Sequence, residues 1–246
     1  MHSRNQLYIS ASQQDLIGRI SLLFAGAGIG SVAAECALRL GFKNITIYDG
    51  DVVELSNLNR QNYVAQDIGK PKTESIHKRL KAIDPDAAIN ACNEFLDNGN
   101  IESAVVKCDI AVNAIDFNSS AWITMDDICQ SMGKTVVHPY NFGWASCAYV
   151  VTPASQTFRD ILNSHQPPEV CVAMHTLNCI KQQAGHKTDW IYDTLKKYEA
   201  GNPAVPPQLS VGNFLAAGAV TSLLFSLANN QAVPVFPEPA FVSARF

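Results

Sequence analysis

The feature that most constrains the fold is a glycine-rich turn, AGAGIGS, at residues 25–31. It follows an apolar run, SLLFA at 21–25, and opens a helical pattern from about Gly30 to Leu40; the alternating segment NITIYDGD comes next. Strand, tight turn, helix and strand in this order are typical of a parallel sheet, because parallel strands need a crossover connection. The chain is therefore predicted to be an α/β protein.

The same alternation continues through the first 140 residues. Helices are predicted at 72–83, 98–107 and 119–132, and strands at 87–92, 108–116 and 134–140. Apolar strands between helical segments indicate a Rossmann-like, doubly wound, mostly parallel sheet with helices on both faces. Residues 143–151 are expected to add an antiparallel extension. Residues 152–207, rich in Pro, Gln, Asn and His, are expected to form a long crossover loop with some helix.

Composition narrows the class of protein. The 246 residues, 47% of them hydrophobic, suffice for one domain, with a nucleotide-binding half at about 20–140 and a C-terminal part at about 152–246. A formal charge of -4 without a Lys/Arg block argues against nucleic-acid and anionic-membrane surfaces. Seven cysteines without C-x-x-C predict neither a disulfide framework nor structural zinc, and they fit a cytoplasmic setting. The N-terminus lacks the apolar core of a signal peptide.

The segment LSVGNFLAAGAVTSLLFSLANN, residues 209–230, approaches the length that spans a bilayer. Glycines, serines, a threonine and asparagines interrupt it, and neither basic residues nor aromatic anchors flank it. We predict a helix buried in the protein or at a subunit interface, with membrane insertion as the lesser alternative. The apolar surface of residues 209–228 is too broad for one side of a surface helix, which predicts a homodimer.

Polar residues gather where such sheets bind ligands, at the carboxyl ends of the strands. The glycine turn can direct backbone N–H groups and a helix dipole at a phosphate. Asp49 closes the second strand, where an acid can bond ribose hydroxyls. The alternative is a structural turn beside a strand-end aspartate. A dinucleotide fingerprint counted from Gly26 and Gly28 needs a third glycine at Ser31, which weakens the hypothesis of a nicotinamide-dependent oxidoreductase.

The stretch NLNRQNYVAQDIGKPK, residues 57–72, carries three cations, Arg60, Lys70 and Lys72, and no hydrophobic period. Hydride transfer does not require an arginine and lysines around a phosphate cluster. Phosphoryl or nucleotidyl transfer does, because fixed cations must neutralise charge on the phosphate oxygens in the transition state. The stretch therefore favours transfer chemistry at a nucleotide phosphate.

The order AGAGIGS, ITIYDGDVVELSNLNRQ, GKPK and NAID resembles the ThiF/MoeB family of ubiquitin-activating-like adenylyltransferases. That family shares G-x-G-G-x-G, D-x-D, N-L-x-R-Q, G-x-P-K and a later Asp in the same order. The resemblance covers residues 4 to about 150 and resumes at 209–228. It implies one ThiF-type adenylation domain over residues 1–246. Such a domain uses Mg-ATP to adenylate the C-terminal carboxylate of a small ubiquitin-fold, sulfur-carrier or peptide substrate, and it releases pyrophosphate.

The resemblance also implies roles for single residues. The ATP-binding set would be Gly26, Gly28, Gly30, Asp49, Asp51, Asn57 and Gln61, with Asp49 on the ribose. Arg60 and Lys72 would stabilise the phosphates, Asp116 would hold Mg²⁺, and Arg4 would reach a phosphate, often across a dimer interface. The residue types agree, since Arg offers a planar cation, Lys a point charge and Asp a hard oxygen ligand.

Each of these residues has a structural alternative. Asp49 and Asp51 could cap the loop, Asn57 could fix a turn, Arg60 could be a solvated surface residue and Asp116 a helix cap. A catalytically silent partner subunit is likewise the alternative to an active enzyme, with the oxidoreductase third.

Two departures from the family pattern bear on function. Ala25 and Ala27 replace the first two glycines of the family turn, where added methyl groups could crowd a phosphate. Some relatives also carry a cysteine nucleophile in the crossover, where this chain has Cys171, with His175 four residues on, and Cys179. Free thiols are commonly buried and inert, which is the alternative for Cys171.

Overall fold

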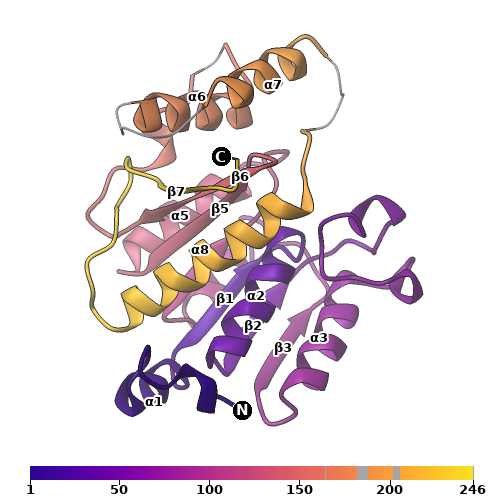
Figure 1. The fold of residues 1–246 in the computed structure, drawn as a ribbon, viewed down its shortest axis with the longest axis vertical. Helices are drawn as coiled ribbons and strands as arrows, with labels where there is room; N and C mark the ends of the chain where they lie inside the picture. Colours follow the sequence, from indigo (N-terminus) through magenta and orange to yellow (C-terminus); the bar gives the residue numbers. More distant parts are fainter. Residues whose placement is uncertain (164, 182–187, 202–205, 246) are drawn as a thin grey trace.

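The computed structural model describes residues 1–163, 165–181, 188–201 and 206–245 (Figure 1). Its centre is a seven-stranded sheet in the order β3-β2-β1-β4-β5-β6-β7. Neighbours from β3 to β5 pair in parallel, whereas β6 and β7 pair antiparallel. The strands are β1 Ser21–Ala25, β2 Asn44–Tyr48, β3 Ala88–Cys92, β4 Ile110–Asn113, β5 Thr135–Asn141, β6 Ala145–Val151 and β7 Ala240–Ser243. The predicted doubly wound sheet with an antiparallel extension is confirmed.

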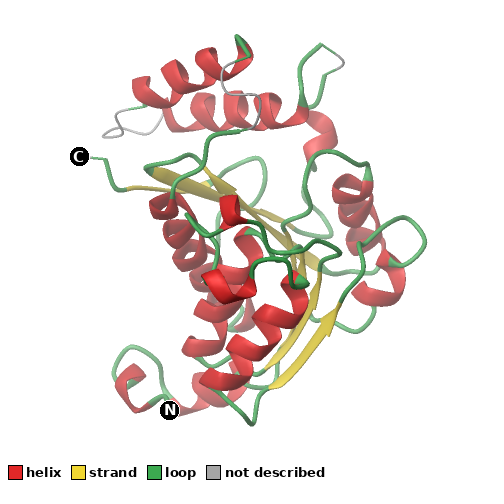
Figure 2. Ribbon diagram, turned by 90° about the vertical axis from the view of Figure 1, so that its right-hand side faces the viewer, coloured by secondary structure: helices red, strands yellow, loops and turns green. Residues whose placement is uncertain are grey.

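Helices cover both faces of the sheet (Figure 2). Side chains of α2, α3 and α8 join one hydrophobic cluster, and those of α4, α5 and α6 join the cluster on the other face. The helices are α1 Ala11–Ile17, α2 Ile29–Leu40, α3 Lys72–Ile83, α4 Ile101–Val105, α5 Ala121–Ser131, α6 Pro168–Lys181, α7 Asp189–Glu199 and α8 Ser210–Ala228, with short 3₁₀ turns at Ser3–Asn5, Leu55–Asn57, Ala65–Asp67 and Phe158–Asp160.

Strand β1 shows why the buried strands read as unbroken apolar runs. Leu22 and Phe24 point into one hydrophobic cluster, and Leu23 and Ala25 point into the other. A strand alternates its side chains between faces, so a strand covered on both faces must be apolar throughout. The sequence pattern of a parallel core strand therefore follows directly from its two helical layers.

The crossover contains more regular structure than predicted. Within residues 152–207 the described part forms α6 and α7, which lie above β6 and β7 at the top of Figure 1. Two further elements, α1 and β7, were not predicted. The seven-residue α1 is held by a capping box in which Ser10 and Gln13 exchange hydrogen bonds, and β7 is a four-residue edge strand. Elements this short carry too few residues for a periodic pattern.

Helix α8 is apolar and long enough to cross a bilayer by length and composition alone, and half of that span is buried. It runs across the sheet, packed against α2, β5 and β6. The helix backbone at Gly212 lies close to the turn after β5, because an added Cβ there would collide with the Asn141 side chain and lie 2.7 Å from the Gly143 carbonyl oxygen. These contacts are those of a core helix, as the sequence predicted.

Candidate active site

A cavity of about 1280 Å³ opens at the carboxyl ends of β1, β2 and β4 and extends to α6 and α7. The structure brings nine predicted site residues to its wall. These are Gly26, Gly28, Asp49, Asp51, Asn57, Arg60, Gln61, Lys72 and Asp116. Gly30, Arg4 and Cys171 do not border it. Residues remote in sequence therefore converge on one space large enough for a nucleotide and part of a second ligand.

The glycine turn is fixed by backbone contacts. Gly26 has φ +103°, and an added Cβ there would collide with the Ala114 carbonyl oxygen, so only glycine fits. Its N–H donates to the Tyr48 carbonyl at 2.8 Å. Gly28 borders the cavity, whereas Gly30 packs against Ala114 inside the protein, where an added Cβ would lie 3.7 Å from the Ala114 Cβ. The turn thus presents the start of α2 to the cavity.

The departures at Ala25 and Ala27 do not crowd this space. Both residues are fully buried, Ala25 in one core cluster and Ala27 in the other, and neither borders the cavity. The two methyl groups point into the protein interior, so they do not crowd a phosphate at this turn, as the sequence comparison had suggested they could.

Asp49 braces the loops that follow β1 and β2. Its two carboxylate oxygens accept hydrogen bonds from the backbone N–H groups of Ala27 at 2.7 Å and Asp51 at 2.8 Å. Lys72 Nζ lies 2.8 Å from an Asp51 oxygen and 4.0 Å from an Asp49 oxygen. The structural role of Asp49 is thus visible in the structure, and its contact with a ribose stays a prediction.

The loop with Arg60 is tied to α2 through Glu35. The Glu35 carboxylate accepts from Asn62 Nδ2 at 2.8 Å and Arg39 Nε at 2.8 Å, and it also pairs with Arg79. Burial opposes ionisation of Glu35, but the hydrogen bonds from Arg79 and Arg39 outweigh it and lower its pKa. The charged network therefore holds the start of this loop against a rigid helix.

Asn57 and Gln61 shape the same loop. Asn57 is buried, its Oδ1 accepts from the Glu54 N–H at 3.0 Å, and its carbonyl accepts from the N–H groups of Arg60 and Gln61. The turn-fixing role weighed from the sequence is therefore present. Gln61 Oε1 is buried without a hydrogen-bond partner among the described residues, so an acceptor oxygen remains for a ligand or water.

The guanidinium of Arg60 is held in place by three protein oxygens. Its Nε donates to Gln208 Oε1 at 2.5 Å, and Nη1 donates to the Ser56 carbonyl at 2.9 Å and to Asn59 Oδ1 at 2.8 Å. Burial lowers the pKa of Arg60, and the nearby Asp116 charge opposes that shift. Within the described chain Nη2 has no such partner, so this nitrogen remains for a phosphate oxygen.

Asp116 follows β4, and its side chain is exposed to the cavity. The pKa of Asp116 is raised, mainly because the cavity walls separate its carboxylate from bulk water. The negative charges of Asp51 and Asp49 also raise this pKa, whereas the positive charges of Lys72 and Arg60 lower it. No described residue forms a hydrogen bond or ion pair with its carboxylate. A hard cation such as Mg²⁺ would find here a carboxylate ligand that need not first break a protein contact.

Arg4 lies far from the cavity of its own chain. It is exposed, and its neighbour Asn5 donates to the carbonyl of Leu40, the last residue of α2, at 3.0 Å. The cavity lies at the first turn of this 12-residue helix, about 18 Å away by helical rise. Arg4 can therefore serve a phosphate only in another subunit.

The cysteine candidates do not face the cavity. Cys171 is buried on α6, with Asn163 Nδ2 3.4 Å from its sulfur. His175 lies beside Cys179 instead, at 3.5 Å, but the same ring nitrogen is 2.9 Å from the Pro237 carbonyl and must donate to it. Burial raises the pKa of Cys179. Among the described residues, Cys171 has no neighbouring base or cation, and the ring nitrogen beside Cys179 donates to the Pro237 carbonyl, so neither thiol shows the activation of a nucleophilic cysteine there.

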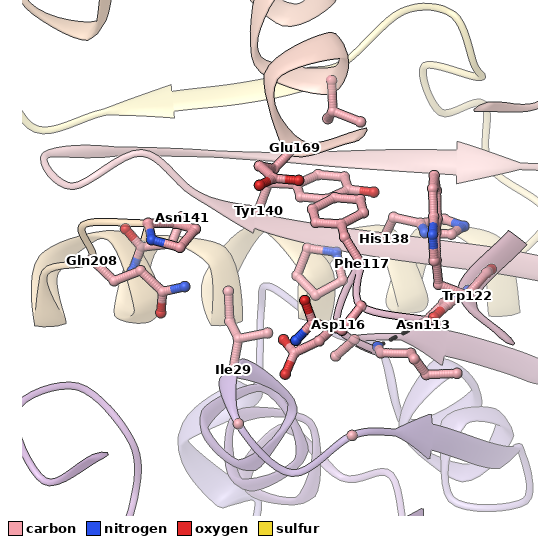
Figure 3. Close-up of a pocket in the computed structure, with 18 of the residues that line it drawn as sticks. Ile29, Asn113, Asp116, Phe117, Trp122, His138, Tyr140, Asn141, Glu169 and Gln208 are labelled. Carbon is pink, nitrogen blue, oxygen red and sulfur yellow. Dashed lines mark hydrogen bonds between the residues drawn. The ribbon is translucent and has the colours of Figure 1, made fainter. Parts of the chain in front are cut away.

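The inner part of the cavity holds residues that sequence reasoning missed (Figure 3). They are Asn113, Phe117, Trp122, His138, Tyr140, Asn141, Glu169 and Gln208. The dashed line in Figure 3 marks the 2.6 Å bond from Asn113 Nδ2 to the Trp122 carbonyl. The sequence offered one signal for them, the polar residues within the predicted strand KTVVHPY. A histidine in a buried strand usually has a polar partner, so its presence indicates a polar site nearby.

The fold and the site define a class: a doubly wound α/β protein with a glycine-rich turn at a helix N-terminus and a cationic loop beside it. The chain belongs to the ThiF family, whose sequence model matches residues 2–236. This match confirms the resemblance seen in the motifs.

Relatives and solved structures agree with that membership. The SAMP-activating enzyme E1 of Haloferax volcanii is 29% identical over 58% of this chain and 53% of its own length. The sulfur carrier protein ThiS adenylyltransferase of Escherichia coli is 26% identical over 64% of this chain and 63% of its own. The chain therefore spans about half to two thirds of these relatives.

Two solved structures share the fold at low identity. PaaA superposes with a TM-score of 0.67 and 18% identity over 95% of this chain and 72% of that one. Escherichia coli MccB, solved with ATP, gives 0.64 and 18% over 90% and 60%. The overall fold described above is thus shared with these two solved structures.

Proposed function

We propose that this protein is an ATP-dependent adenylyltransferase that activates a substrate carboxylate as an acyl-adenylate and releases pyrophosphate. One observation carries the proposal: Arg60, Lys72 and Asp116 face a single cavity at the start of α2. Two cations, and a carboxylate without a partner in the described part of the chain, lie beside a helix N-terminus and match a nucleoside triphosphate with its divalent cation.

The residues divide the work by their chemistry. The substrate carboxylate attacks the α-phosphorus of ATP, the bond to the β-phosphate oxygen breaks, and pyrophosphate leaves with the electron pair. Arg60 and Lys72 stabilise charge on the phosphate oxygens during this displacement. Asp116 would hold Mg²⁺, which when bound neutralises phosphate charge. Gly26 and Gly28 leave room for the phosphates at the turn.

The acceptor is proposed to be a small ubiquitin-like, sulfur-carrier or peptide substrate that ends in a free carboxylate. The cavity supports this because its lining continues from Asp116 to residues of α6 and α7, Glu169 among them. This additional space can take the end of a second chain beside a nucleotide. The names of the relatives, a ThiS adenylyltransferase and a SAMP-activating enzyme, support the same substrate class.

The test is isotope exchange between pyrophosphate and ATP with Mg²⁺ present. The acceptors offered are purified ThiS, a SAMP protein and MccA, with which Escherichia coli MccB has also been solved. Exchange that depends on one of these carboxylates is expected. ATP binding without exchange would point instead to a catalytically silent subunit, and NADH binding without ATP binding would point to an oxidoreductase.

Gln208 is expected to position Arg60. Gln208→Ala removes the acceptor of Arg60 Nε and should lower the exchange rate by roughly tenfold, because a displaced catalytic group loses alignment. Affinity for ATP should change little, as calorimetry can show. Gln231→Ala, at an exposed glutamine beyond α8, is the matched control. Equal rates for the two variants would contradict the role.

We also propose a homodimer in which Arg4 acts in the partner's cavity. The N-terminal segment supports this, since Leu7 and Tyr8 are almost fully exposed beside Arg4. Light scattering should give twice the monomer mass at micromolar concentration. Mixing Arg4→Ala chains with Arg60→Ala chains should restore roughly a quarter of the activity, because each mixed dimer regains one site. A monomer, or no recovery, would contradict the proposal.

A further inference from the structure

A buried histidine lies at the inner wall of the cavity with a buried aspartate behind it, and neither residue has a part in the adenylation just described. His138, on β5, is 1% exposed and borders the cavity. Its Nε2 lies 2.8 Å from Oδ1 of Asp126, a residue of α5 that is fully buried and does not border the cavity. Asp126 can therefore influence a ligand only through the cavity residues that it contacts, of which His138 is the nearest.

The pairing determines which nitrogen of His138 is available. A carboxylate can only accept a hydrogen bond, so Nε2 carries the hydrogen and Nδ1 keeps its lone pair in the neutral ring. Asn113 Nδ2 lies 3.5 Å from the same Asp126 oxygen, which helps to hold it. The other oxygen, Oδ2, is buried without a partner among the described residues. Such an arrangement fixes an imidazole as a proton acceptor.

Aromatic rings surround this histidine. The His138 ring centre lies 4.7 Å from that of Phe158 and 6.4 Å from that of Tyr140. Tyr140 in turn stacks parallel to Phe117 at 5.9 Å. Burial raises the pKa of Tyr140 well above its ordinary value, so this hydroxyl remains protonated and adds no charge. The surroundings of the imidazole are therefore apolar and protected from water, which limits hydrolysis of a reactive intermediate.

Adenylation itself gives such a base nothing to do, because an ionised carboxylate attacks phosphorus without losing a proton. Attack on the resulting acyl-adenylate by a nitrogen nucleophile does release one proton. No cysteine borders the described cavity, so a thiol of this chain does not receive the acyl group there. The presence of a proton acceptor, His138, and the absence of a cysteine from the described cavity lining both favour direct transfer of the acyl group to nitrogen.

We propose that this cavity carries out a second step, transfer of the activated acyl group from AMP to an amine or amide nitrogen, with His138 as the general base. The nitrogen forms a bond to the acyl carbon, the carbon–oxygen bond to AMP breaks, and AMP leaves with the electron pair. The proton from nitrogen passes to Nδ1 of His138, and Asp126 positions the ring. The inference rests on the proposed adenylation and extends it to amide-bond formation.

The experiment measures the two steps separately in the full chain. Pyrophosphate–ATP exchange reports adenylation with the acceptor found among ThiS, a SAMP protein and the MccA peptide. Amide formation is followed by mass spectrometry after glycinamide is added as the nitrogen nucleophile. His138→Gln keeps an N–H for Asp126 but supplies no base. It should lower the ratio of amide formation to exchange by roughly a hundredfold, the lower end of general-base effects.

Asp126→Asn should lower the same ratio by a smaller factor, and it decides the matter if His138→Gln unfolds. His77→Gln, on α3 and away from the cavity, should leave both rates at wild-type values. An equal fall of both steps in the His138 and Asp126 variants would make the pair structural and overturn the inference. Wild-type exchange without amide formation would also overturn it, while adenylation would stand. Absence of exchange in the wild type would reject adenylation and this second step together.

Discussion

Arg60→Ala is expected to lower the rate of acceptor-dependent pyrophosphate exchange by roughly a hundredfold or more, with only a modest loss of ATP affinity. Its guanidinium is already held by Gln208, Ser56 and Asn59, so little reorganisation is needed when charge moves onto the phosphates. A fixed cation of this kind stabilises the transition state more than the bound nucleotide. Exchange kinetics and ATP titration by calorimetry, run side by side, separate the two effects.

Lys70→Ala is the matched control for Arg60→Ala. Lys70 belongs to the same cationic stretch but is exposed and does not border the cavity. Its removal changes the charge of the loop by the same amount, and we expect exchange within about threefold of wild type, since exposed charges are screened. A wild-type rate for Arg60→Ala, or an equal loss in both variants, would remove Arg60 from the catalytic set.

Asp116→Asn should reduce magnesium-dependent exchange by about a thousandfold, because a metal's contribution to charge stabilisation is worth several kcal/mol. Asparagine keeps the shape but not the charge of the ligand. The thermal unfolding midpoint should stay close to wild type, since Asp116 makes no ion pair among the described residues. Circular dichroism on heating supplies this check, and a variant with normal exchange would show that Asp116 is no ligand.

The same carboxylate should give the wild type a characteristic pH dependence. Cavity walls raise the pKa of Asp116 above its ordinary value of 3.8, so it takes up a proton at a higher pH than a free aspartate. Magnesium needs the ionised form. Magnesium affinity should therefore be complete above the raised pKa and fall as the pH is lowered through it. Magnesium titrations in the presence of ATP should show a larger loss in the wild type than in Asp116→Asn, where only the protonation of ATP itself remains.

The sequence predicted the parallel half of the fold well because its central strands, β1 and β4, are buried on both faces. Leu22 to Ala25 read as an apolar run for that reason, and the helix predicted at 72–83 begins and ends where α3 does. The sequence did not predict short elements whose order depends on contacts with other segments or on a local cap rather than on a hydrophobic pattern. Strand β7 is ordered by pairing with β6, and α1 by a local capping box.

The residues of the candidate site likewise fall into those that the sequence predicted and those that it did not. Residues in motifs, such as Arg60 and Asp116, were found because their spacing from a strand end is local information. Gln208 and His138 were not, since their partners lie 148 and 12 residues away along the chain. Gly30 belongs to a motif but packs inward, because one turn of helix rotates it toward Ala114. Motif spacing thus identifies candidates, whereas packing decides which of them reach the cavity.

The ties between Arg60 and the last helix have a consequence for synthesis of the protein. Arg60 binds the Gln208 side chain, and its carbonyl accepts from Asn213 Nδ2 at 2.9 Å, 153 residues later. During translation the glycine turn, the Arg60 loop and Asp116 are all made long before α8. Until residues 208–213 leave the ribosome, Arg60 lacks one partner of its guanidinium and one partner of its backbone carbonyl. The final position of the Arg60 loop is thus set only when the C-terminal part of the chain has been made, so a nascent chain has the loop before it has the loop's full set of contacts.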